Sequence, residues 1–165
     1  MTYQEILDKL SKEQLFLDWE VHHPAKFLSH FFAQINGKIA LISPWEIGFY
    51  DTITKKITIF TEYENNFIIK PADDVFKKES DEVEQLKLED IKISLDQAKK
   101  NCLKALPEKF PSEAFGDGFL ILQCWKENIV WNFTFITKSL KFVNLKISAN
   151  NGEVIEHQAV ELVQK

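Results

Sequence analysis

The histidines near the N-terminus are the first residues of this chain that could take part in chemistry. His22 and His23 adjoin Asp18 and Glu20, and His30 follows them closely. Imidazole and carboxylate groups bind metals, but a metal site needs fixed spacing, such as two histidines one helical turn apart. Adjacent histidines point apart in a strand. We therefore interpret these histidines as solvated loop side chains and predict no metal site.

Carboxylates and glycines are the next candidates for chemistry. Acidic residues gather at 73–74 and over 79–84. A general acid–base pair needs two carboxylates in a pocket with separated pKa values, whereas a run of charge is usually solvated. The Gly116-Asp117-Gly118 segment has neither the serine of a nucleophile elbow nor the lysine of a phosphate loop. We predict no catalytic residue and no cofactor, which favours a protein that is not an enzyme.

The cysteines Cys102 and Cys124 do not form a disulfide framework. Their neighbours, among them Leu103 and Leu122, are typical of a core. Free cysteine is among the most buried residue types, so we expect buried thiols rather than nucleophiles.

Composition narrows the range of partners. The chain has 165 residues with a net charge of −5, and 45% of them are hydrophobic, which is enough for a folded core. All its basic side chains are lysines. Because arginine is preferred for recognising phosphate and guanine, its absence argues against a nucleic-acid partner.

The N-terminal segment MTYQEILDKLSKEQ is polar and acidic, unlike a signal peptide. No apolar run approaches the length needed to span a membrane. These features predict a cytoplasmic protein without a membrane partner.

Two helices are predicted from capping boxes, in which Ser or Thr is followed three residues later by Glu or Gln. Thr2-Tyr3-Gln4-Glu5 opens a helix over about 2–14, and Ser94-Leu95-Asp96-Gln97 opens a second helix that Pro107 ends. The charged stretch 72–92 predicts a connector with one short strand near 83–88.

Alternating apolar and polar residues predict antiparallel strands after each helix. Asn36-Gly37 is a strong hairpin signal between two of them. The predicted strands lie near 27–35, 39–42, 45–50, 57–60 and 67–69 in the first half, and near 119–125, 131–135, 143–147 and 154–163 in the second. The order of a helix followed by strands therefore occurs twice.

An internal repeat is predicted from self-similarity. At a shift of 86 positions Trp45 falls on Trp131 and Phe49 on Phe135, as expected for structural anchors in equivalent places. Phe27 and Phe31 match Phe115 and Phe119 at a shift of 88, and the capping boxes match at 92. At 86 the coincident apolar positions are Ile47 with Phe133, Ile57 with Val143, Ile59 with Leu145, and Ile68 with Val154. The alternative is that any two antiparallel meanders share alternation.

The fold class predicted is α+β, with two tandem units that each place a helix on an antiparallel sheet. The units span 1–76 and 92–165, and a charged connector spans 77–91.

The second unit resembles PepSY-type domains over 92–156. The resemblance rests on KISLDQAKKNCLKAL, VWNFTF and VNLKISANNGEVIE, whose last hairpin has Ile147, Ala149, Gly152 and Val154 in the family's slots. It implies a PepSY-like or cystatin-like architecture and a binding or inhibitory module, without catalytic residues. Some such domains are associated with secreted peptidases, which the absence of a signal peptide does not match.

Aromatic residues exceed what a small core needs, and exposed aromatic residues are common anchors of interfaces. Trp125 lies at a predicted hairpin tip, and Phe60 lies on the strand face opposite Ile57 and Ile59. With Trp19 they form the candidate interaction surface, although all of them could instead pack between the two units.

Two functions remain open from the sequence. The first is a non-enzymatic protein-binding or inhibitory module. The alternative is a small-ligand-binding or enzymatic domain with a pocket between helix and sheet. The chain could be a monomer, or a homodimer that pairs a free sheet edge near 154–163.

Overall fold

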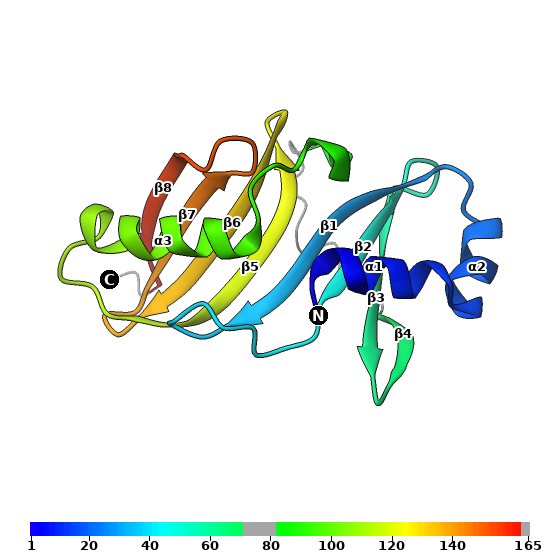
Figure 1. The fold of residues 1–165 in the computed structure, drawn as a ribbon, viewed down its shortest axis with the longest axis horizontal. Helices are drawn as coiled ribbons and strands as arrows, with labels where there is room; N and C mark the ends of the chain where they lie inside the picture. Colours follow the sequence, from blue (N-terminus) through cyan, green and yellow to red (C-terminus); the bar gives the residue numbers. More distant parts are fainter. Residues whose placement is uncertain (71–81, 163–165) are drawn as a thin grey trace.

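One antiparallel sheet runs through the whole molecule. A computed structural model describes residues 1–70 and 82–162. Eight strands follow the order β4-β3-β2-β1-β5-β6-β7-β8, so each half runs outward from the centre in chain order (Figure 1). β1 pairs with β5, which makes the sheets of the two halves continuous. The predicted α+β class is confirmed.

The central strands of the sheet are longer than the strand at one edge. β5 and β6, near the centre, extend over eleven and ten residues, whereas β4 at one edge has five. The bounds are β1 Lys26–Ile35, β2 Glu46–Asp51, β3 Lys56–Tyr63, β4 Asn66–Lys70, β5 Phe115–Trp125, β6 Asn128–Thr137, β7 Lys141–Ser148 and β8 Val154–Glu161.

The helices lie on one face of this sheet (Figure 1). α1 (Tyr3–Ser11) and α2 (Gln14–Val21) cover the first half, and α3 (Leu95–Lys109) covers the second. Tyr3 packs edge-on against Phe31 and Trp131, so α1 reaches across the centre of the sheet. No helix among the residues with described structure is both long and apolar enough to cross a membrane.

The two halves anchor their helices in the same way. The Trp45 indole N–H donates to the Met1 carbonyl at 3.1 Å, and the Trp131 indole N–H donates to the Ile93 carbonyl at 2.9 Å. Both carbonyls stand one residue before the N-cap of a helix, which is Thr2 in the first half. The predicted equivalence of the two tryptophans is confirmed.

The capping predictions are confirmed at the helix starts. Thr2 and Glu5 form the reciprocal capping box, and the Ser94 hydroxyl accepts the Gln97 N–H. Pro107 does not end the second helix, which runs to Lys109. Pro107 supplies no N–H to the helix ladder, yet the helix continues for two more residues and the Phe110 N–H bonds the Leu106 carbonyl at 2.9 Å.

Residues 14–21 form α2, which was not predicted, and Phe16 anchors it in the core. Two local predictions are wrong. Residues 39–42 make only an isolated bridge, between Ile35 and Leu41, because β1 pairs directly with β2. Residues 83–88 form no strand; the Leu86 N–H instead donates to the Leu28 carbonyl at 2.9 Å.

The predicted repeat alignment is one residue out of register in β3. Phe60 pairs with Ile47 on the helix side, just as Leu145 pairs with Phe133. Phe60 is therefore the structural equivalent of Leu145, and Ile59 faces the other side of the sheet. A hairpin loop of different length shifts the register, and a one-residue shift moves every side chain to the opposite face.

A similar shift affects β1. Phe31 pairs with Ile47 and Leu120 pairs with Phe133, so Phe31 is equivalent to Leu120 and not to Phe119.

The predicted boundaries of the two units, at 76 and 92, stay a prediction. The first of them lies among residues 71–81, which with 163–165 lie outside the described residues.

Candidate functional site

The strand register divides the side chains of the sheet between two faces. Phe133 and Leu145 are opposite each other under the helices, and both are fully buried. Asn132 and Lys146, which alternate with them, are opposite each other on the other side. We call that side the helix-free face, because α1, α2 and α3 all cover the opposite one (Figure 1).

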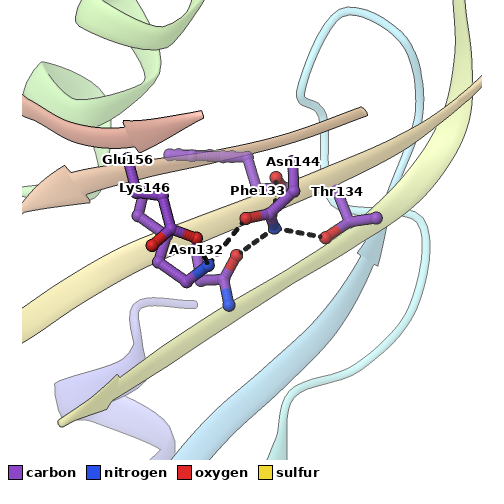
Figure 2. Close-up of polar contacts among 6 residues, drawn as sticks. All are labelled: Asn132, Phe133, Thr134, Asn144, Lys146 and Glu156. Atoms are coloured by element: carbon purple, nitrogen blue, oxygen red, sulfur yellow. Dashed lines mark hydrogen bonds and ion pairs between the residues drawn. The ribbon is translucent and has the colours of Figure 1, made fainter. Parts of the chain in front are cut away.

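A group of polar side chains lies on the helix-free face of the second half. It comes from three neighbouring strands, since Asn132 pairs with Lys146 and Lys146 pairs with Glu156, while Thr134 pairs with Asn144. We call these five residues the polar cluster (Figure 2). Asn132, Thr134 and Lys146 are buried although none of the helices in the described part of the chain covers them.

Asn144 is the centre of the polar cluster. Figure 2 shows its side-chain amide nitrogen donating to three acceptors. These are the Asn132 Oδ1 at 2.5 Å, the Phe133 carbonyl at 3.2 Å and the Thr134 Oγ1 at 2.9 Å. One side chain of β7 thus fixes the rotamers of two side chains on β6.

Lys146 is held by the same cluster. Its Nζ donates to the Asn144 Oδ1 at 2.8 Å and to the Glu156 Oε1 at 2.9 Å. The ammonium also stands 4.7 Å from the centre of the Trp125 ring, within the range of a cation–π contact. Only 8% of the Lys146 side chain is exposed, so its position is fixed before any partner binds.

Trp125 ends β5 at the tip of the β5–β6 hairpin, where it pairs with Asn128. It is half-buried, and the Lys126 ammonium is a further 4.7 Å contact of its ring. The tip is tied to the connector, since the Glu127 N–H donates to the Glu84 Oε1 at 2.8 Å. The indole is therefore a rigid, partly accessible aromatic surface between two cations.

Aromatic side chains adjoin the polar cluster on the central strands. Phe32 of β1 and Phe119 of β5 stack with their ring centres 5.7 Å apart. Ile121 lies between Phe32 and Asn132 in the cross-strand row. The helix-free face thus has an apolar centre directly beside the hydrogen-bonding groups.

One donor of the polar cluster remains available. Figure 2 shows the Asn132 amide nitrogen pointing away from the other side chains. Within 1–70 and 82–162 no acceptor bonds this nitrogen, and no side-chain nitrogen or oxygen atom is both fully buried and unbonded. Its position on the sheet surface allows it to donate to a carbonyl or carboxylate group of a partner.

The three predicted interaction residues do not form one surface. Trp19 and Phe60 contact each other edge-on at 5.2 Å under α2, in the first half. Trp125 lies on the opposite face of the sheet in the second half. Trp19 is half-buried against the core, also stacked on His23 at 4.3 Å.

Phe60 was expected on the surface, and this prediction is wrong. The side chain is fully buried, among Phe16, Trp19 and Phe49. The alternation in β3 was predicted correctly, but its orientation was reversed. Phe60 lies on the helix side, whereas Ile59 lies on the helix-free face beside Gly48.

The histidines are not equivalent. His22 and His23 bond the carbonyls of Asp18 and Trp19 at the end of α2. His30, which we expected in solvent, is buried on β1, where it lies over Gly48 and its Nδ1 is 3.0 Å from the Ser29 hydroxyl. Burial lowers the pKa of His30 to about 4.

The cysteines lack the surroundings of a nucleophile. Cys102 is buried and Cys124 is half-buried, and both are free thiols. Desolvation raises the pKa of each, and at Cys124 the nearby charges of Glu84 and Glu127 raise it further. In the part of the chain with a described structure, no group of three or more His, Cys, Asp or Glu side chains could hold a metal.

Comparisons with known proteins identify a fold but no family. No family model matches the chain, and no curated protein matches it. A crystal structure of a "putative lipoprotein" from Clostridium difficile 630 is similar, with a TM-score of 0.52 over 88% of this chain and 90% of that one. The two sequences are 12% identical, so the likeness concerns the fold alone.

Sequence reasoning did not identify the polar cluster. It treated Asn132, Thr134, Asn144 and Lys146 as the outward half of an alternating pattern. A signal was present in the sequence, because the outward positions of β6 and β7 hold the amides of Asn132 and Asn144, and asparagine is depleted in strands. Which of those positions lie opposite one another depends on the register of the hairpin, and the loop sets that register.

Proposed function

We propose that this chain is a non-catalytic, PepSY-like protein-binding module whose partner docks on the helix-free face of the second half. The observation that carries the proposal is the position of Lys146. A lysine that is nearly inaccessible to solvent is fixed by Asn144, Glu156 and Trp125 on a face that no helix covers. The fold does not require this arrangement.

The physical properties of the face support a protein partner. Binding is stronger when the contacting side chains are already immobile, because less conformational entropy is lost. Trp125 offers a rigid aromatic anchor, and the central Phe32 and Phe119 offer apolar area. The Asn132 amide adds a directional donor, so we expect a partner segment that combines an apolar side chain with a carbonyl or carboxylate group.

The alternative pocket between helix and sheet has no comparable support. Buried side chains of the helices, among them Leu10, Cys102 and Leu106, occupy that interface.

Affinity capture from native extract tests the proposal when three baits are compared by quantitative mass spectrometry. They are the wild type, Trp125→Ala, and Leu103→Ala as a control on the exposed side of α3. We expect a stoichiometric protein that the wild type and the control retain and Trp125→Ala loses. Hydrogen exchange of the purified complex should then show protection on β5, β6 and β7.

Two outcomes would contradict the proposal. One is the absence of any stoichiometric partner. The other is a partner that Trp125→Ala retains and that protects α3 instead of the helix-free face.

A cytoplasmic location also stays a prediction from the N-terminal sequence, and fractionation of the native cells checks it.

A further inference from the structure

β8 is the outer strand of the second half, and its far side carries main-chain groups that the described residues do not pair (Figure 1). The Leu162 N–H donates at 3.0 Å to the carbonyl of Leu140, the residue directly before β7. Because bonded pairs alternate along an antiparallel ladder, His157, Ala159 and Glu161 direct their N–H and C=O groups away from β7. These three residues form the outward edge of β8.

The two edges of the sheet are protected to different degrees. β4 has only five residues, with Lys70 at its end and Pro71 directly after it. Short length, lysine and proline all disfavour pairing with another strand. β8 has eight residues and contains neither lysine nor proline. A bulge at its start leaves Glu156–Glu161 in regular register with β7.

Exposed apolar side chains reach this edge on the helix-free face. Ile136, Phe142 and Val160 are opposite one another in a row across β6, β7 and β8. Their exposed fractions are 42%, 36% and 52%, so the row is accessible up to the outermost strand. An edge strand of this length with an adjoining apolar row is a template for adding a strand.

We propose that a second copy of this chain pairs with the β8 edge, antiparallel, about a two-fold axis at Ala159. If the axis is perpendicular to the sheet, the helices of both copies lie on the same side of the joined sheet. Residues that pair across the axis must then have their side chains on the same face of that sheet. With the axis at Ala159, all three outward-facing residues meet an outward-facing partner. Ala159 of one copy is opposite Ala159 of the other, and the two-fold symmetry forms the pair of His157 with Glu161 twice.

Charge complementarity selects this register. The imidazole of His157 can donate to the carboxylate of Glu161 in the other copy, and opposite cross-strand pairs are favourable. Both side chains are exposed in the single chain, on the helix side of β8. On the helix-free face Val160 is opposite Gln158, which brings the apolar rows of the two copies together.

The dimer forms one continuous sheet of both copies. Its two helix-free faces lie on the same side, so a partner protein would meet two copies of the candidate binding face. This inference does not depend on that function, because it concerns the edge and not the face.

Sedimentation equilibrium over micromolar to millimolar concentrations tests the pairing with wild type, H157E, E161K and the double variant H157E/E161K. We expect a wild-type dimer. H157E should raise the dimer dissociation constant about tenfold or more, because a like-charge pair forms twice. The double variant should restore it, since the charges again match. Circular dichroism confirms that each variant folds.

Oxidation of Ala159→Cys gives an independent measure of the register. Bonded antiparallel partners have Cα atoms about 5.5 Å apart, which a disulfide can span. We expect a covalent dimer from Ala159→Cys and none from the control Glu153→Cys. A wild type that stays monomeric at every concentration overturns the proposal, as does a dimer that H157E leaves intact or that Ala159→Cys fails to cross-link.

Discussion

The two halves of the sheet share their helix side and differ on their helix-free side. Under the helices, Trp45 and Trp131 make the same hydrogen bond to the residue before a helix N-cap. Ile47 and Phe133 are likewise buried in equivalent places. This side is dictated by the need to bury one face of each unit against a helix.

On the helix-free side, equivalent positions carry different chemistry. The register makes Ile59 the equivalent of Asn144, Gly48 that of Thr134, and Thr61 that of Lys146. Glu46 is the equivalent of Asn132, and it forms an ion pair with Lys70 at 3.1 Å where the second half has the five-residue polar cluster. Since both halves form the same architecture, the fold does not demand this particular cluster, and the proposed binding role is the hypothesis that the variants below test.

Replacing each anchoring tryptophan tests whether the halves are energetically equivalent. Trp131→Ala should lower the free energy of unfolding by about 3–5 kcal/mol, because it removes a fully buried indole and its hydrogen bond. Trp45→Ala should cost an amount near the lower end of that range, since its side chain is slightly more exposed than that of Trp131. Chemical denaturation followed by circular dichroism measures both.

The shape of the transition is equally informative. Because β1 and β5 join the halves in one sheet, we expect a single cooperative transition in both variants. Two separate transitions would show that the halves fold as independent units.

The position of His30 is occupied by Phe119 in the second half, so His30 is a titratable group of the first half alone and should make stability depend on pH. Its pKa is about 4 in the folded chain and about 6.5 in an unfolded one, so the unfolded state binds the proton first. The contribution of the neutral, buried His30 to the free energy of unfolding is full above about pH 6.5. About 3 kcal/mol of it is lost as the pH drops to 4. Unfolding at several pH values measures the slope.

His30→Phe provides the control for this prediction. It removes the titrating group while keeping a large ring over Gly48. The variant should lose most of the slope between pH 6.5 and 4. An unchanged slope would assign the pH dependence to other groups.

Local sequence rules predicted the parts of the fold that depend on neighbours in the chain. The capping residues Thr2 and Ser94 fixed the helix starts, and apolar alternation in β6 and β7 identified the buried side. The matching tryptophans indicated the repeat, because each indole lies on the same strand position of its half and bonds the carbonyl before a helix N-cap.

The rest depended on long-range geometry. The β2–β3 loop shifts Phe60 onto the helix side, and no property of β3 alone distinguishes that register from the predicted one. α2 begins without a side-chain cap, so its start carried no signal. The polar cluster exists only once Asn132, Asn144 and Glu156 from three strands are in register.

The smallest effect on stability should come from importing the first-half residue into the cluster. Asn144→Ile removes one acceptor of Lys146 and the donor to Asn132 and Thr134, which should cost about 1–3 kcal/mol because buried polar groups lose a partner. Ile59→Val, at the equivalent position of the first half, should cost about 0.5–1.5 kcal/mol. Denaturant titration measures both.

The two variants should separate sharply in partner capture. If the cluster is the binding site, Asn144→Ile weakens capture several-fold because Lys146 and Asn132 lose their fixed positions, whereas Ile59→Val leaves capture unchanged. Equal capture by both would remove the cluster from the binding surface, while equal loss would show that capture follows stability. Denaturant titration gives the stability cost of each change, so a loss of capture beyond what that cost accounts for measures what the second half does beyond folding.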